Sequence, residues 1–175
     1  MRRKLVLGFV LIALSISCAK QSPPTNAPVA AASPSVSQTR NSVDVVKVNT
    51  STTEIKRNQT ADASLQLVIE KGYHVNANPP TFPYLKATEV ELQQTPSISV
   101  SFIVYPDALT KKFEFADKPL AVYEGTTTIK VKLKADKSAQ PGTQNLSGKL
   151  RVQACDEQVC YAPGTLDVSL PLDIK

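Results

Sequence analysis

Strict alternation of apolar and polar side chains is the feature that most constrains what this chain can fold into. Residues 128–134 alternate apolar side chains with lysine without a break, and residues 64–70 alternate before a turn at Lys71-Gly72. Similar runs follow at residues 89–92, 98–105, 146–154 and 166–174. Because successive side chains of a strand point to opposite faces, these runs predict strands with one buried and one solvated face, as in antiparallel sheets.

Turn-forming residues separate these runs, for example at Asn78-Pro79-Pro80, Thr95-Pro96 and Glu124-Gly125. The chain has 13 prolines, no tryptophan and only 6% aromatic residues, and no segment carries a sustained helical stripe of apolar residues. These features argue against a helical bundle. We therefore expect an all-β domain, an immunoglobulin-like antiparallel β-sandwich of about 7–9 strands.

Residues 1–18 have the pattern of a bacterial export signal. Arg2, Arg3 and Lys4 precede an apolar run at residues 5–14, and small residues then lead to Cys18. This run is shorter than the roughly 20 residues that a membrane-spanning helix needs. We expect an exported protein located in the periplasm.

Cys18 resembles the lipidated cysteine of a lipobox, although Ser15 stands where the usual box has leucine, and small residues before it would also suit an ordinary signal peptidase. Residues 19–41 are rich in Pro, Ala, Ser, Thr and Gln, which predicts a flexible tether. A tether favours a lipoprotein held to a membrane through its lipid anchor only. The folded domain is then expected at residues 42–175.

Charge excludes a nucleic-acid partner. The formal net charge is +5, and removing the three basic residues of the export signal leaves 5 − 3 = +2, with no basic stripe to neutralise phosphates. The lysines of residues 130–134 are interpreted as the solvated face of an edge strand, in preference to a site for an anionic ligand.

The sequence offers few catalytic residues. His74 is the single histidine, which excludes a multi-histidine metal site, and no glycine-rich phosphate loop is present. We expect no metal and no cofactor. His74 follows Gly72-Tyr73 at the end of a strand, where a structural or solvent-exposed role is favoured over a catalytic one.

If Cys18 is lipidated, Cys155 and Cys160 remain as a pair in an oxidising compartment. If they flank a hairpin with the four-residue loop 156–159, their Cβ atoms face each other and their Cα atoms lie about 5.5–6 Å apart. Closing so short a loop stabilises a fold by only about 2 kcal/mol. On this argument a redox function and a structural cross-link remain equally open. Asp156 and Glu157 disfavour a thiolate beside them, which suits a relay with chosen partners.

Several motifs, read together, carry a family resemblance. They are residues 72–80, 84–92, 104–106 and 122–125, and above all Val152 to Cys155 with Cys160 to Pro163. In order and spacing they resemble the N-terminal periplasmic domain of the thiol:disulfide interchange protein DsbD. The resemblance implies an immunoglobulin-like sandwich with a redox-active cysteine pair. It also implies a thiol:disulfide oxidoreductase that exchanges electrons with thioredoxin-fold periplasmic proteins.

Carried over by residue, the resemblance makes Cys155 and Cys160 the catalytic pair, with Cys160 bonding to the partner and Cys155 resolving. It places an aromatic cap loop at residues 112–117, where either Phe113 or Phe115 shields the cysteines, although a strand's core face explains both equally well. Two departures are four residues between the cysteines instead of five, and an end at Lys175 without the membrane conduit. A separate membrane electron-conduit protein is therefore an expected partner. The alternative is a non-enzymatic binding or adaptor β-sandwich lipoprotein with a structural disulfide.

Overall fold

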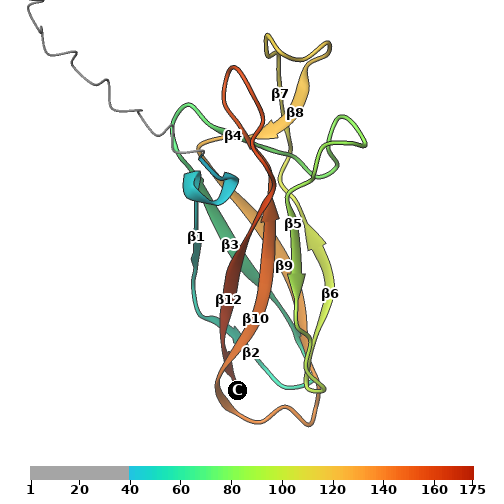
Figure 1. Ribbon diagram of the computed structural model, residues 1–175. Coiled ribbons are helices and arrows are strands. Elements are labelled where there is room, and N and C mark those ends of the chain that lie inside the picture. The colour runs from blue at the N-terminus through green and yellow to red at the C-terminus, as the bar shows by residue number, and fades with distance from the viewer. Residues whose placement is uncertain (1–39) are drawn as a thin grey trace, which may run out of the picture. The chain divides into compact units, whose positions relative to one another are not determined.

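The computed structural model describes residues 40–175, which form 12 strands and one short 3-10 helix (Figure 1). The elements are η1 (Ser42–Val45), β1 (Val46–Thr50), β2 (Thr53–Ile55), β3 (Thr60–Ile69), β4 (His74–Asn76), β5 (Glu89–Leu92), β6 (Ile98–Val104), β7 (Leu109–Lys111), β8 (Leu120–Tyr123), β9 (Thr126–Ala135), β10 (Gly142–Val152), β11 (Ala154–Cys155) and β12 (Gly164–Ile174).

The strands form three four-stranded sheets, in the orders β1-β3-β9-β6, β2-β12-β10-β5 and β11-β4-β8-β7. Among the described strands, all pairings are antiparallel except the parallel pair β12 and β2. The first two sheets make the sandwich, and the third lies at the end away from the C-terminus, where Figure 1 shows β4, β7 and β8 together.

The core lies between the two large sheets and follows from the alternation. Leu65 and Leu133 from one sheet and Leu150 and Leu170 from the other are all 0% exposed and belong to one apolar cluster. Burying such a side chain stabilises the fold by about 1.5–3 kcal/mol. A smaller second cluster under the third sheet consists of Phe113, Leu120 and Val122.

The prediction of an all-β, immunoglobulin-like sandwich is confirmed. The structure has 12 strands where we expected 7–9, because β2, β4, β7 and β11 are only two or three residues long and too short to show alternation. The lysines of β9 do face outward, but the prediction of an edge strand is wrong, since β9 pairs with β3 on one side and β6 on the other.

A bulge in β6 changes which residues face the core. The register with β9 shifts between Val100 and Phe102. Unbroken alternation would bury Phe102 and Val104, yet these are 54% and 48% exposed, and Ile103 packs against the core instead. A bulge inserts one residue into one strand and so reverses the faces beyond it.

The predicted export signal, Cys18 and nearly all of the predicted tether lie outside the described residues. At the start of the described part, Arg40 donates a hydrogen bond to the Tyr73 hydroxyl at 2.6 Å and lies over the Tyr73 ring. Across residues 40–175, no helix is long and apolar enough to cross a membrane.

Candidate functional site

Cys155 and Cys160 are joined by a disulfide in a tight hairpin that follows β11. Their Cα atoms are 3.9 Å apart, closer than the 5.5–6 Å that we expected. The backbone explains the difference: Tyr161 N donates to Ala154 O and Asp156 N donates to Val159 O on either side of the pair. The cysteines thus occupy the non-hydrogen-bonded position of an antiparallel ladder, where strands approach most closely.

The two cysteines differ in exposure. Cys155 is 0% exposed, and its neighbours Val152 and Ala154 are also fully buried. Cys160 is half-buried and lines an open groove. An attacking thiol can therefore reach Cys160 more readily than Cys155.

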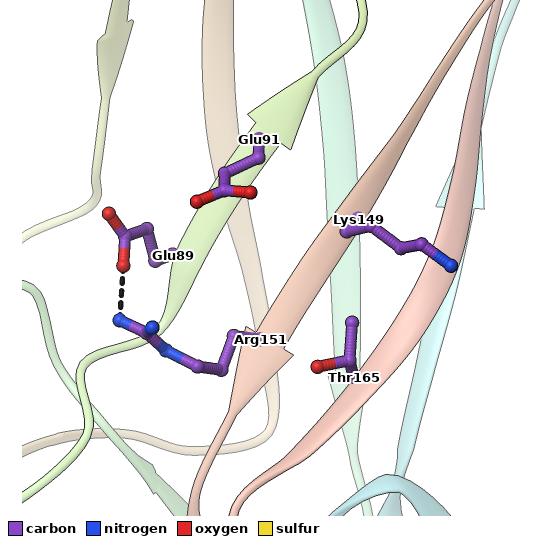
Figure 2. Close-up of a pocket in the computed structure, with 5 residues that line it drawn as sticks. All are labelled: Glu89, Glu91, Lys149, Arg151 and Thr165. Carbon is purple, nitrogen blue, oxygen red and sulfur yellow. Dashed lines mark hydrogen bonds and ion pairs between the residues drawn. The ribbon is translucent and has the colours of Figure 1, made fainter.

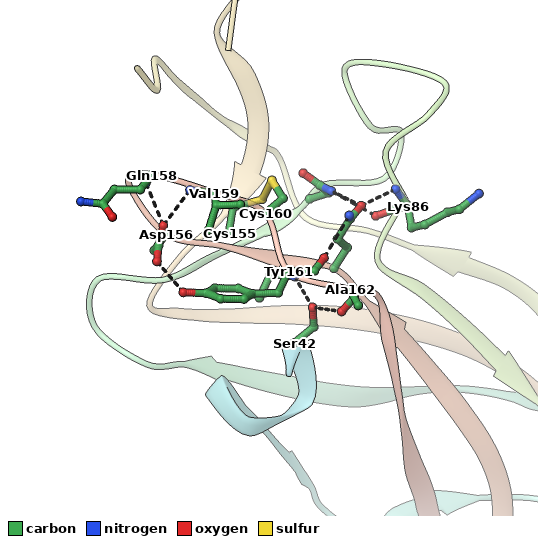
Figure 3. The surroundings of a disulfide bond; sticks show 12 residues. Ser42, Lys86, Cys155, Asp156, Gln158, Val159, Cys160, Tyr161 and Ala162 are labelled. Carbon is green, nitrogen blue, oxygen red and sulfur yellow. Dashed lines mark hydrogen bonds between the residues drawn. A yellow bond between two sulfur atoms is a disulfide. The ribbon is translucent and has the colours of Figure 1, made fainter. Parts of the chain in front are cut away.

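Asp156 organises the loop between the cysteines (Figure 3). Its carboxylate accepts hydrogen bonds from the backbone N–H groups of Gln158 and Val159 at 2.7 and 2.8 Å, and another from the hydroxyl of Tyr161. The Tyr161 bond lowers the pKa of the Asp156 carboxyl, and the same bond raises the pKa of Tyr161 to about 12. The negative charge of Asp156 is thus hydrogen-bonded within the loop and is not a free charge beside the sulfurs.

The side chains of Ser42 and Gln153 fix the cysteine hairpin through hydrogen bonds to the backbone. Ser42 in η1 accepts a hydrogen bond from Ala154 N at 2.9 Å and donates one to Ala162 O at 2.6 Å, so it joins both arms of the hairpin (Figure 3). Gln153 accepts from Lys86 N at 2.7 Å and donates to Tyr161 O at 3.2 Å. Neither residue was predicted, because each acts across a long stretch of sequence.

A charged cluster lies beside Cys155 on the third sheet. His74 is the direct register partner of Cys155 and is 2% exposed. Its Nε2 atom lies 2.6 Å from Lys111 Nζ and 3.0 Å from Glu124 Oε2. Lys111 Nζ also lies 2.9 Å from Glu157 Oε1 in the cysteine loop. The structure therefore places His74 opposite Cys155. Its burial excludes the solvent-exposed position that the sequence allowed and is compatible with the structural one.

The two phenylalanines of the expected cap loop have separate environments. Phe113 is 1% exposed, packs in the second cluster and meets the His74 ring edge to face at 5.1 Å. Phe115 is 40% exposed and lines the groove beside Cys160. Phe113 thus occupies a core position, the alternative to which we gave equal weight. Phe115 lies beside Cys160, the position expected of a residue that shields the cysteines.

The groove beside Cys160 has a volume of about 270 Å³. Three apolar side chains on its rim are strongly exposed, namely Tyr84 at 71%, Val159 at 49% and Phe115. Its other lining residues are Leu85, Ala116, Asp117, Leu120 and Gln158. The accessible sulfur of Cys160 therefore lies next to an exposed apolar surface.

A second cleft has a different character (Figure 2). Glu89, Glu91, Lys149, Arg151 and Thr165 line it, all from the outward faces of β5, β10 and β12. Arg151 pairs with Glu89 across the two strands. The lining consists of polar surface side chains without a cysteine, and it provides no redox group.

Within the described part of the chain, no cluster of three or more His, Cys, Asp or Glu side chains has the geometry to hold a metal ion.

The fold and the site together define a class: an immunoglobulin-like β-sandwich with a disulfide-bonded cysteine hairpin at one end. The chain belongs to the family "Thiol:disulfide interchange protein DsbD, N-terminal", whose model matches residues 42–171. Among curated proteins none matches the chain.

Two solved structures are similar to this chain. The N-terminal periplasmic domain of ScsB from Proteus mirabilis is 19% identical, with a TM-score of 0.52 over 74% of this chain and 47% of that chain. This chain thus spans about half the length of that structure. The N-terminal domain of DsbD from Neisseria meningitidis, in the reduced form, is 16% identical, with a TM-score of 0.43 over 74% of this chain and 87% of that one. At 19% identity the similarity to the ScsB domain concerns the fold alone.

Proposed function

We propose that this protein is an exported thiol:disulfide exchange domain. It passes electrons between a membrane reductant and thioredoxin-fold periplasmic proteins through Cys155 and Cys160. The observation that carries the proposal is the asymmetry of the pair: Cys155 is fully buried, whereas Cys160 opens into an apolar groove. Family membership supports the same chemistry.

In this proposal the two sulfurs have different tasks. Exchange proceeds by attack of a thiolate on a disulfide, through a mixed disulfide. In the reduced domain Cys160 attacks the partner's disulfide, and one partner sulfur leaves as a thiolate. Cys155 then attacks Cys160, the intramolecular disulfide forms, and the second partner sulfur leaves. Two electrons pass to the partner, which is reduced to a dithiol.

The groove supplies the docking surface. Tyr84, Phe115 and Val159 expose apolar side chains around Cys160. A partner that covers them excludes water from the reacting sulfurs and gains about 25 cal/mol for each Å² of apolar surface buried. In the absence of a partner, Phe115 is proposed to limit access of small thiols and oxidants to Cys160.

Single-cysteine variants test the roles of the pair. Cys155→Ser leaves Cys160 without a resolving thiol. The reduced variant should therefore form a long-lived mixed disulfide with a thioredoxin-fold protein whose single active-site cysteine has first been converted to its disulfide with thionitrobenzoate, which leaves as the thiolate. Cys160→Ser should form no adduct, because Cys155 is buried. Non-reducing gels show both results. The opposite pattern would exchange the assigned roles.

A redox titration tests the alternative of an adaptor with a structural disulfide. Structural disulfides of secreted proteins have potentials below about −300 mV, and exchanging ones lie higher. A potential clearly above that value supports the relay. A potential well below it, together with no adduct from either variant, would establish the adaptor.

The proposed location is the periplasm, with the domain tethered through a lipid on Cys18. The support is the order of an apolar run, Cys18 and a Pro- and Ser-rich segment. The intact mass of the mature protein tests this, since diacylglycerol on Cys18 adds a characteristic increment. Cleavage elsewhere without added lipid would exclude the anchor.

A further inference from the structure

The proposed resolving step requires a buried thiol to lose its proton. The thiolate is the attacking species, and burial in apolar surroundings disfavours it. Cys155 is 0% exposed, and Ala154 before it is equally buried. Water is therefore poorly placed to take the proton, and a protein group close to Cys155 is needed.

His74 is in position to be that group. It is paired directly with Cys155 across β11 and β4, and the Cβ atoms of directly opposed residues in an antiparallel pair lie about 4.5–5.5 Å apart. His74 is 2% exposed, and no described residue hydrogen-bonds to its Nδ1 atom. A buried polar atom without a partner costs stability, so this atom is available to a partner that appears only when the disulfide is reduced.

Charged side chains from three segments surround His74. Lys111 on β7, Glu124 after β8 and Glu157 in the cysteine loop are joined to His74 or to one another by ion pairs. One cation and two carboxylates give a net charge of −1, which protonation of His74 brings to zero. Glu124 can also accept a hydrogen bond from Nε2, which leaves the lone pair on Nδ1. Cys155 as nucleophile, His74 as base and Glu124 as the group that orients the base match the arrangement that activates cysteine and serine nucleophiles in enzymes.

We propose that His74 accepts the proton of the Cys155 thiol during resolution and returns it when the domain is reduced again. In the forward step Cys155 Sγ transfers its proton to His74 Nδ1 and attacks Cys160 Sγ. The bond between Cys160 and the partner sulfur breaks, and the partner leaves as a thiolate with the electron pair. Glu124 holds the imidazole and balances its charge, and Lys111 competes with Glu124 for Nε2. This proposal rests on the proposed function.

The resolving step can be timed separately with the chromogenic disulfide dithiobis-nitrobenzoate. The probe is mixed in equimolar amount with the reduced full chain carrying Cys18→Ser. Attack by Cys160 releases the first coloured thiolate, and attack by Cys155 releases the second. Cys155→Ser in the same background should release the first only.

The neutral variant His74→Gln should slow the second release roughly 10- to 100-fold near pH 7, towards the low end of what a general base contributes. The first release should be unchanged. The difference should narrow as the pH rises, because a growing fraction of the thiol then ionises without a base. A uniform slowing at every pH, or equal second releases throughout, would overturn the proposal.

Two further variants should change the rate of the second thiolate release in opposite directions. Glu124→Gln removes the charge that balances the imidazolium and should slow the second release. Lys111→Met removes the competitor for Nε2 and should accelerate it. Equal effects of both variants would mean that the cluster acts only through packing. Thermal unfolding of each variant establishes that it is folded.

The two proposals fail differently when the probe assay is combined with a second assay, reduction of a thioredoxin-fold partner's disulfide by the reduced domain. If the exchange function is wrong, a thioredoxin-fold partner disulfide remains unreduced even by the unaltered pair. If only the role of His74 is wrong, exchange with the partner proceeds and the second release has the same pH profile in His74→Gln as in the parent.

Discussion

Ser42 and Ala154 are 112 residues apart in sequence, yet Ser42 Oγ accepts a hydrogen bond of 2.9 Å from the backbone N–H of Ala154. The same hydroxyl donates to Ala162 O at 2.6 Å. Because Ala154 and Ala162 flank the cysteine hairpin, a single side chain from η1 holds the two arms in place. Ser42 is 0% exposed, so water cannot substitute for it.

Ser42→Ala should therefore destabilise the domain by about 1–3 kcal/mol, the cost of leaving a buried donor unsatisfied. Urea unfolding measures the loss. Ser147→Ala is the matched control, because Ser147 is exposed on β10 and should change stability by less than about 0.5 kcal/mol. Equal losses in both variants would contradict a specific role of Ser42.

Phe113 and Phe115 should respond differently to truncation. Phe113→Ala removes a buried ring and should cost about 3–5 kcal/mol. Phe115→Ala should cost about 1 kcal/mol or less, because the ring is 40% exposed. It should, however, accelerate reduction of the disulfide by dithiothreitol several-fold, since it uncovers the groove. Unchanged reduction in Phe115→Ala would remove the shielding role.

Reduction of the disulfide should leave the domain folded. The bond closes a loop with a sequence separation of 5, and such a closure contributes only about 2 kcal/mol. Urea unfolding with and without reductant measures the difference, and circular dichroism should show sheet in both states. A reduced form that unfolds at room temperature would favour a structural cross-link.

The hydrogen bonds that the Asp156 carboxylate accepts within the cysteine loop should make the domain more stable at neutral pH than in acid. Its pKa is lowered in the folded state by the hydrogen bond from Tyr161. A carboxyl with a lowered folded pKa stabilises the fold above its unfolded pKa of about 3.9, and the contribution disappears as the pH falls through the folded value. The parent should therefore have a higher melting temperature than Asp156→Asn near pH 6. The difference should shrink as the pH falls below the unfolded pKa of about 3.9. A difference that persists in acid would show that the charge is not responsible.

Alternation along the sequence was enough to predict the sandwich, because a strand's side chains alternate between core and solvent whatever it pairs with. The outward lysines of β9 follow from the same rule. Alternation carries no information about neighbours, and so the sequence placed β9 at an edge. It also carries none about register, and so the bulge at Val100 and Phe102, which exposes Phe102, could not be anticipated.

The cysteine pair was visible in the sequence because its partners are close neighbours along the chain. The rest of the site depends on contacts between distant segments. His74 lies opposite Cys155 only because β4 pairs with β11, and Lys111 reaches His74 only because β7 joins the same sheet. Local sequence determines strands, turns and a short hairpin by steric rules that act over a few residues. The surroundings of the sulfurs were decided by pairing between strands far apart in sequence, which only the tertiary structure contains.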